Sequence, residues 1–179
     1  MELIDELTKV HNEGFGSKYC CLVCPIARTP KAVRSFYQRH PERLPYCGVA
    51  LGKNGEVLGF IQIAIHPMHD KDGLHETKPG EAYIEQVGVG AAARGKGVGK
   101  LLLTWAETQA RERGCTLLTL GVLNGNPARR LYERFGFREI EVDPCEQCIV
   151  TGVVFCIVGR PYGLCDPHCG AVDMRKPLQ

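Results

Sequence analysis

The spacing of apolar residues predicts two helices in the first part of the chain. Residues 2–13 carry apolar side chains at helical intervals, namely Leu3, Leu7 and Val10. Thr29-Pro30 is typical of a helix start, because threonine caps the first turn and proline fits the first helical position. Pro41 is expected to end this second helix, since proline cannot continue one.

Runs rich in apolar and β-branched residues predict strands over much of the remaining chain. The expected strands are residues 46–51, 56–65, 83–89, 116–122, 137–142, 149–158 and 171–174. Asn54-Gly55 between the first two is a strong hairpin signal. Glycines also bound a longer helix that ends near Arg113 and a short helix over residues 126–135. This mixed order predicts one α+β domain over residues 1–179, with a mixed sheet and helices on its faces.

Composition narrows the class of protein without indicating an activity. The 179 residues are 44% apolar and 23% charged, which is typical of a globular domain that buries its own core. A net charge of +2 gives no argument for nucleic acid or a membrane as a partner, and no run approaches the roughly 20 apolar residues of a membrane span. Residues 1–6 are acidic, unlike a signal peptide, so a cytoplasmic protein is expected.

A glycine-rich turn over residues 94–100, between a predicted strand and a predicted helix, is the first candidate site. Its glycines let backbone N–H groups approach a ligand, and the helix N-terminus favours a diphosphate. A P-loop is excluded, because Arg94 and Leu101 stand where that motif requires glycine and Ser/Thr. A dinucleotide fingerprint over residues 88–93 is the weaker alternative, because the next strand does not end in the acidic residue that would bind the ribose.

Two motifs resemble the GNAT superfamily of N-acetyltransferases. Arg94-x-x-Gly97-x-Gly99 is similar to the acetyl-CoA signature of that family, and residues 124–137 are similar to its second block, Asn-x-x-Ala-x-x-Leu-Tyr-x-x-x-Gly-Phe. The resemblance implies the GNAT acyl-CoA N-acyltransferase fold, with a central mixed, mostly antiparallel twisted sheet flanked by helices and a cofactor-binding core over residues 81–142. The family usually begins with a strand, whereas this sequence begins in a predicted helix.

The resemblance also implies how acetyl-CoA, the acyl-donor substrate, is bound. The backbone of Val87 and Val89 is expected to pair with the pantetheine arm as an extra strand would. Asn126 and Tyr132 are expected beside the sulfur. The pyrophosphate is expected on the turn, at Arg94, Gly95, Lys96, Gly97, Val98, Gly99 and Lys100.

Acylation of an amine by a thioester requires a base for the ammonium proton, donors for the oxyanion and a proton for the departing thiolate. The resemblance makes Tyr132 the expected acid and a backbone N–H near Val87 the expected oxyanion donor. Glu85 is the candidate base, and strand alternation predicts that it shares a face with Val87 and Val89, as do Glu81 and Tyr83. Solvent exposure of Glu85, or binding of the acceptor's positive charge by it, remains an alternative.

Histidines and cysteines outside the two motifs offer further candidates. His66, His69 and His75 lie in a loop that could reach an acceptor pocket, although loop histidines are usually solvated. The cysteines cluster at Cys20, Cys21 and Cys24, at Cys145 and Cys148, and at Cys165 and Cys169. They could form a zinc site or a redox-sensitive group, but incidental thiols are favoured, because the spacing is unusual for a zinc finger. No metal is therefore predicted.

The sequence thus predicts an N-acetyltransferase that transfers the acetyl group of acetyl-CoA to a primary amine by direct attack in a ternary complex. The acceptor stays open between a small-molecule amine or polyamine and a peptide amine. The alternative is an acetyl-CoA-binding domain without turnover. A homodimer is also left open.

Overall fold

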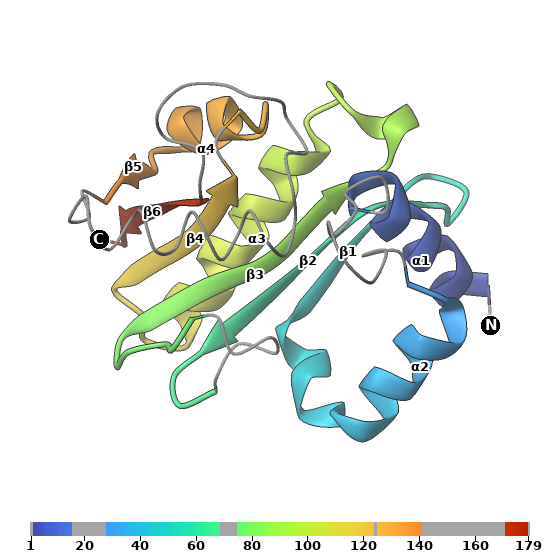
Figure 1. Ribbon diagram of the computed structural model, residues 1–179, viewed down its shortest axis with the longest axis horizontal. Helices are drawn as coiled ribbons and strands as arrows, with labels where there is room; N and C mark the ends of the chain where they lie inside the picture. Colours follow the sequence, from blue (N-terminus) through green and yellow to red (C-terminus); the bar gives the residue numbers. More distant parts are fainter. Residues whose placement is uncertain (1, 16–27, 69–74, 124, 141–170, 179) are drawn as a thin grey trace.

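A mixed six-stranded sheet forms the centre of the computed structural model, which describes residues 2–15, 28–68, 75–123, 125–140 and 171–178 (Figure 1). The strands lie in the order β1-β2-β3-β4-β6-β5. Only β3 and β4 pair in parallel among them, so the predicted mixed, mostly antiparallel sheet is confirmed. The strands are β1 (Cys47–Leu51), β2 (Val57–Ile65), β3 (Glu81–Val89), β4 (Leu117–Leu123), β5 (Arg138–Glu139) and β6 (Ala171–Pro177).

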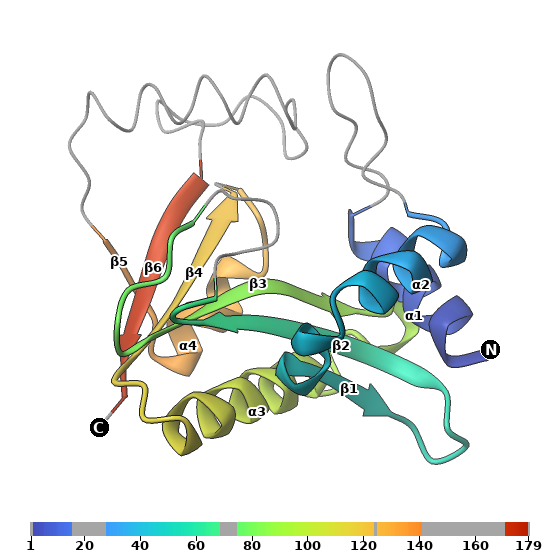
Figure 2. The same ribbon diagram turned by 90° about the horizontal axis from the view of Figure 1, so that it is seen from below.

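Helices cover both faces of this sheet (Figure 2). α1 (Glu2–Phe15) and α2 (Pro30–Arg39) lie on one face, and α3 (Val98–Glu112) lies on the other, together with α4 (Arg129–Phe135). The described residues also contain two 3₁₀ turns, η1 (Pro41–Tyr46) and η2 (Ala91–Ala93). None of the helices in the described part of the chain is long and apolar enough to cross a membrane.

The main core lies between the sheet and α3. Ile61, Ile63, Leu103 and Leu118 are fully buried there. A smaller cluster of Leu7, Val10, Val57 and Phe60 packs under α1 on the opposite face. Since both faces of β2 are covered, this strand is apolar almost throughout, as its sequence predicts.

The last two strands differ from the expectation. β5 (Arg138–Glu139) begins after Phe137 rather than at it, because Phe137 turns into the core with 2% of its surface exposed. Residues 141 and 142 of the expected strand lie outside the described residues. β6 extends three residues beyond the expected end at Met174, since it pairs with β4 along its whole length. The expected strand at residues 149–158 lies outside the described residues.

Candidate active site

β3 and β4 pair only over their first residues and then diverge (Figure 1). The parallel register runs from Glu81 opposite Leu117 to Ile84 opposite Leu120, while β3 continues to Val89. Within the described residues no strand pairs with this far half of β3 on the β4 side. Its backbone on that side is therefore available to an extended ligand, since main-chain N–H and C=O groups require hydrogen-bond partners.

A β-bulge at Glu85 lies at the point where the two strands part. Ile84 is opposite Ile63 and Gln86 is opposite Gln62, so Glu85 is the additional residue of β3. The bulge shifts the alternation of side chains. Val87 and Val89 pack toward the core beside α3, whereas Glu85 pairs with Arg43 of η1 on the other side. The expectation that Glu85 shares a face with Val87 and Val89 is therefore wrong.

The glycine turn follows the open half of β3 and leads into α3. Gly95 and Gly97 have φ of 75° and 84°, in the left-handed region that glycine adopts without strain. Gly97 is the N-cap of α3 and supplies no side-chain cap, so the first N–H groups of a 15-residue helix remain for a ligand. Gly99 has another role, because a Cβ there would lie 2.8 Å from Cδ2 of Leu131 on α4.

Replacing Gly97 with alanine is expected to lower the free energy of unfolding by about 1–2 kcal/mol, the cost of a left-handed L-residue. Open space around this position means that the cost comes from φ alone. Gly14→Ala is the matched control and is expected to stabilise α1, where an added Cβ meets nothing within 4 Å. Urea unfolding of both variants measures the difference, and equal effects would contradict the left-handed turn.

Arg94 contacts the end of α1. Its Nη2 donates to the Glu13 carbonyl oxygen at 3.1 Å, and its Nε donates to the Val89 carbonyl oxygen at 3.3 Å. The Glu13 carboxylate in turn accepts from the Ala91 N–H at 2.7 Å. The end of α1 is therefore hydrogen-bonded to the segment that leads into the glycine turn. The sequence did not indicate this contact. Lys96 and Lys100 are exposed beside the turn, with their charges available to an anion.

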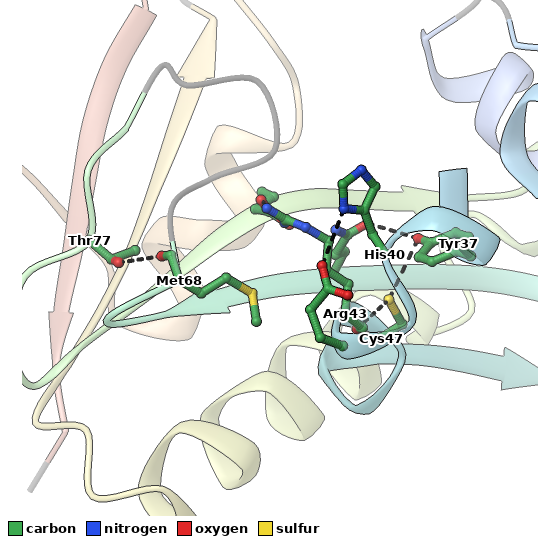
Figure 3. Close-up of polar contacts among 9 residues, drawn as sticks. Tyr37, His40, Arg43, Cys47, Met68 and Thr77 are labelled. Atoms are coloured by element: carbon green, nitrogen blue, oxygen red, sulfur yellow. Dashed lines mark hydrogen bonds and ion pairs between the residues drawn. The ribbon is translucent and has the colours of Figure 1, made fainter. Parts of the chain in front are cut away.

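Glu85 forms a buried ion pair. Its Oε1 accepts from Nη1 of Arg43 at 2.8 Å, and the two side chains are only 2% and 11% exposed. Arg43 comes from η1, close to Tyr37 of α2 and Cys47 of β1, all on one side of the sheet (Figure 3). A buried charge requires such a partner, because its desolvation is otherwise costly. The ion pair with Arg43 thus holds the Glu85 carboxylate at the point where β3 and β4 diverge.

A second carboxylate, that of Glu81, lies in the paired half of β3. It accepts from the Thr119 hydroxyl at 2.5 Å and the Lys78 N–H at 2.9 Å, and His75 Nε2 lies 2.8 Å away. Burial opposes ionisation, but these hydrogen bonds prevail and lower the pKa of Glu81. The His75 ring also stacks on Tyr83 at 4.1 Å. Glu81 is thus held in a hydrogen-bonded network rather than at the opening.

Tyr132 and Asn126 belong to the segment that follows β4. Tyr132 is 6% exposed within the core beside α3, and its ring meets Phe137 edge-on at 6.1 Å. Oδ1 of Asn126 accepts from the Ala128 N–H at 3.0 Å and so shapes the turn before α4. Glu85 and Tyr132 therefore approach from opposite sides of the sheet. Their predicted roles remain predictions.

The loop histidines do not form one group in the described residues. His66 Nδ1 lies 2.9 Å from the Thr77 carbonyl oxygen, His75 contacts Glu81, and His69 lies outside the described part. The three cysteine clusters also lie outside it. Among the residues that the structure does describe, no group of three His, Cys, Asp or Glu side chains could hold a metal ion.

Solved structures of N-acetyltransferases share this fold. The chain matches the PaiA N-acetyltransferase of Thermoplasma acidophilum in complex with coenzyme A, with a TM-score of 0.62 and 16% identity over 98% of this chain and 93% of the other. It also matches the ribosomal-protein-alanine N-acetyltransferase of Brucella melitensis, with a TM-score of 0.63 and 19% identity over 98% and 94% of the two chains. The fold is that of the acyl-CoA N-acyltransferases.

The chain belongs to the acetyltransferase (GNAT) family, whose profile matches residues 11–137. The aminoalkylphosphonate N-acetyltransferase of Salmonella typhimurium is 35% identical over 139 residues, which are 75% of this chain and 85% of that protein. The streptothricin acetyltransferase of Streptomyces lavendulae is 36% identical over 50% of this chain, and the chain spans 42% of that relative's length. The resemblance inferred from the two motifs is thereby confirmed.

Proposed function

We propose that this chain is an N-acetyltransferase that transfers the acetyl group of acetyl-CoA to a primary amine by direct attack in a ternary complex. The observation that carries the proposal is the opening between β3 and β4, with the glycine turn at one end and the Glu85 carboxylate where the strands part. Membership of the GNAT family supports acetyl-CoA as the acyl donor.

The residues around the opening fit such a donor. No described strand pairs with the backbone of β3 near Val87 and Val89 on the β4 side, and this backbone suits the amide groups of a pantetheine arm, which would bind as an added strand does. The first N–H groups of α3, together with Lys96 and Lys100, suit a pyrophosphate. A thioester that reached the parting of the strands would lie between Glu85 on one side of the sheet and Tyr132 on the other.

In the proposed reaction the amine nitrogen forms a bond to the thioester carbonyl carbon, and the C–S bond then breaks. Glu85 takes the ammonium proton, through a water molecule, while Arg43 holds the carboxylate in place. Tyr132 gives its phenolic proton to the departing thiolate, because the ordinary pKa of a phenol, about 10, is close to that of an alkyl thiol. A backbone N–H near Val87 is proposed to stabilise the oxyanion.

Turnover with a panel of amines tests the proposal. Purified protein is incubated with acetyl-CoA and, separately, polyamines, amino acids, peptides with free N-termini and aminoglycosides, and the released thiol is measured. Amine-dependent thiol release with formation of the acetylated product is expected. Binding of acetyl-CoA without turnover of any amine would instead indicate a binding domain. A larger thermal shift with NAD than with acetyl-CoA would contradict the cofactor assignment.

A further inference from the structure

A small cavity lies between α1, α2 and the sheet, on the side to which Glu85 points. Its volume is about 30 Å³. Aliphatic, aromatic and polar side chains line it, among them His11, Phe36, Tyr37, Phe60, Gln62 and Gln86. A space of this size admits one or two oxygen-sized groups, because a single water needs roughly 10–15 Å³ on the same measure. The mixed lining distinguishes it from a packing defect among apolar residues.

The amide of Gln62 is the group in this cavity whose hydrogen bonding is incomplete. The side chain is 2% exposed, and its Oε1 accepts from the Tyr37 hydroxyl at 2.8 Å. Its Nε2 has no hydrogen-bond partner among the residues that the structure describes. A buried donor without a partner costs free energy. A ligand oxygen that accepted a hydrogen bond from this N–H group would remove that cost.

The orientation of this amide follows from Tyr37. Burial raises the pKa of the Tyr37 phenol, and the nearby Cys47 thiol and Glu85 carboxylate raise it further. The phenol therefore keeps its proton, and since its oxygen accepts from the Cys47 thiol at 3.6 Å, its O–H donates to the carbonyl oxygen of the amide. This leaves Nε2 as a donor, which selects an oxygen atom and rejects a positively charged ammonium group.

The cavity adjoins the proposed reaction centre. Gln62 lies directly opposite Gln86, and Gln86 follows Glu85 in β3. Because of the bulge, Glu85 and the cavity-lining side chain of Gln86 lie on the same side of the sheet. Residues along a strand are about 3.3 Å apart, so one small acceptor molecule can span both points.

We propose that Gln62 determines acceptor specificity, with its Nε2 donating to a carbonyl or carboxylate oxygen close to the reacting amine. The inference rests on the proposed acetyltransferase function. The Nε2 donor of Gln62 would favour amino acids, amino-acid amides and peptide N-termini over polyamines, because polyamines carry no oxygen that could accept its hydrogen bond. Arg28 lines the same cavity and adds a positive charge that favours a carboxylate over a neutral carbonyl.

Acceptor pairs test this specificity first on the unmodified protein. Alaninamide, alanine and the dipeptide Ala-Ala are compared with isopropylamine and with a polyamine by their kcat/KM. Higher kcat/KM is expected for the three oxygen-bearing amines, and the preference between alanine and the two amides separates carboxylate from carbonyl. Equal or better turnover of isopropylamine or the polyamine would overturn the inference while leaving the acetyltransferase function intact. No turnover of any amine would overturn both.

Gln62→Met keeps the size of the side chain and removes the donor. It is expected to raise KM for the preferred oxygen-bearing amine about ten-fold, as the loss of one buried hydrogen bond does. Its kcat, and its KM for isopropylamine, should stay within about two-fold. Gln38→Met on the exposed surface of α2 is the matched control. An equal loss for both amines would overturn the inference and indicate that Nε2 holds only a structural water.

Discussion

Replacing Arg43 with methionine is expected to lower the free energy of unfolding by about 3–5 kcal/mol, because the buried Glu85 carboxylate then loses its guanidinium. The effect is large since neither side chain can turn to bulk water; they are 11% and 2% exposed. Methionine keeps much of the side-chain volume, so the loss reports the charge rather than a cavity. Chemical denaturation at neutral pH measures it.

Two further variants separate this ion pair from a general surface effect. Arg43→Met combined with Glu85→Gln should recover most of the lost stability, because no buried charge is then left without its partner. Arg111→Met removes the exposed Arg111–Glu107 pair, with Arg111 40% exposed, and should cost less than about 1 kcal/mol. A loss for Arg43→Met no greater than that for Arg111→Met would show that the buried pair is not formed in solution.

Replacing Tyr132 with phenylalanine is expected to lower kcat by about 10²–10⁴-fold, the usual contribution of a general acid. The ring should keep its edge-on contact with Phe137 in the core, so the fold and the binding of acetyl-CoA should change little. Steady-state kinetics gives kcat, and a separate titration gives the Kd for acetyl-CoA. Unchanged turnover would refute the acid role of this hydroxyl.

The matched control for this loss is Tyr46→Phe. Tyr46 ends η1 and lies under the Arg113 guanidinium, 5.1 Å from its ring centroid, so it too is a partly packed tyrosine. Its kcat should remain close to that of the unmodified protein. A similar fall in both variants would mean that removing a phenol hydroxyl disturbs the protein generally.

Local sequence signals predicted much of the fold because they act over a few residues. The Thr29 hydroxyl accepts from the Ala32 N–H at 3.2 Å and begins α2 as expected. Gly55 takes the left-handed φ of 83° in the hairpin between β1 and β2. In contrast, η1 replaced the expected strand start at Tyr46, because two prolines over residues 41–45 favour a short turn rather than an extended start.

The candidate site could be predicted only in part. The two motifs located the glycine turn and α4, since each is contiguous in sequence. Arg43 was not foreseen, because it meets Glu85 across 42 residues and nothing in its neighbours marks it as buried. The donor of Gln62 was likewise hidden inside an apolar strand. Contacts of this kind depend on how distant elements pack, which one short segment does not encode.

The bulge at Glu85 divides β3 into two halves. The alternation of inward and outward side chains is regular within each half and shifts by one residue between them. Ile84 and Val87 can both serve the apolar core although they are three positions apart, an interval that regular alternation forbids. Deleting Glu85 would join Ile84 directly to Gln86 and give a regular strand, with Val87 still opposite Ile61 and on the core side. The apolar pattern of β3 therefore does not require the inserted residue, and what the insertion adds is the carboxylate that pairs with Arg43.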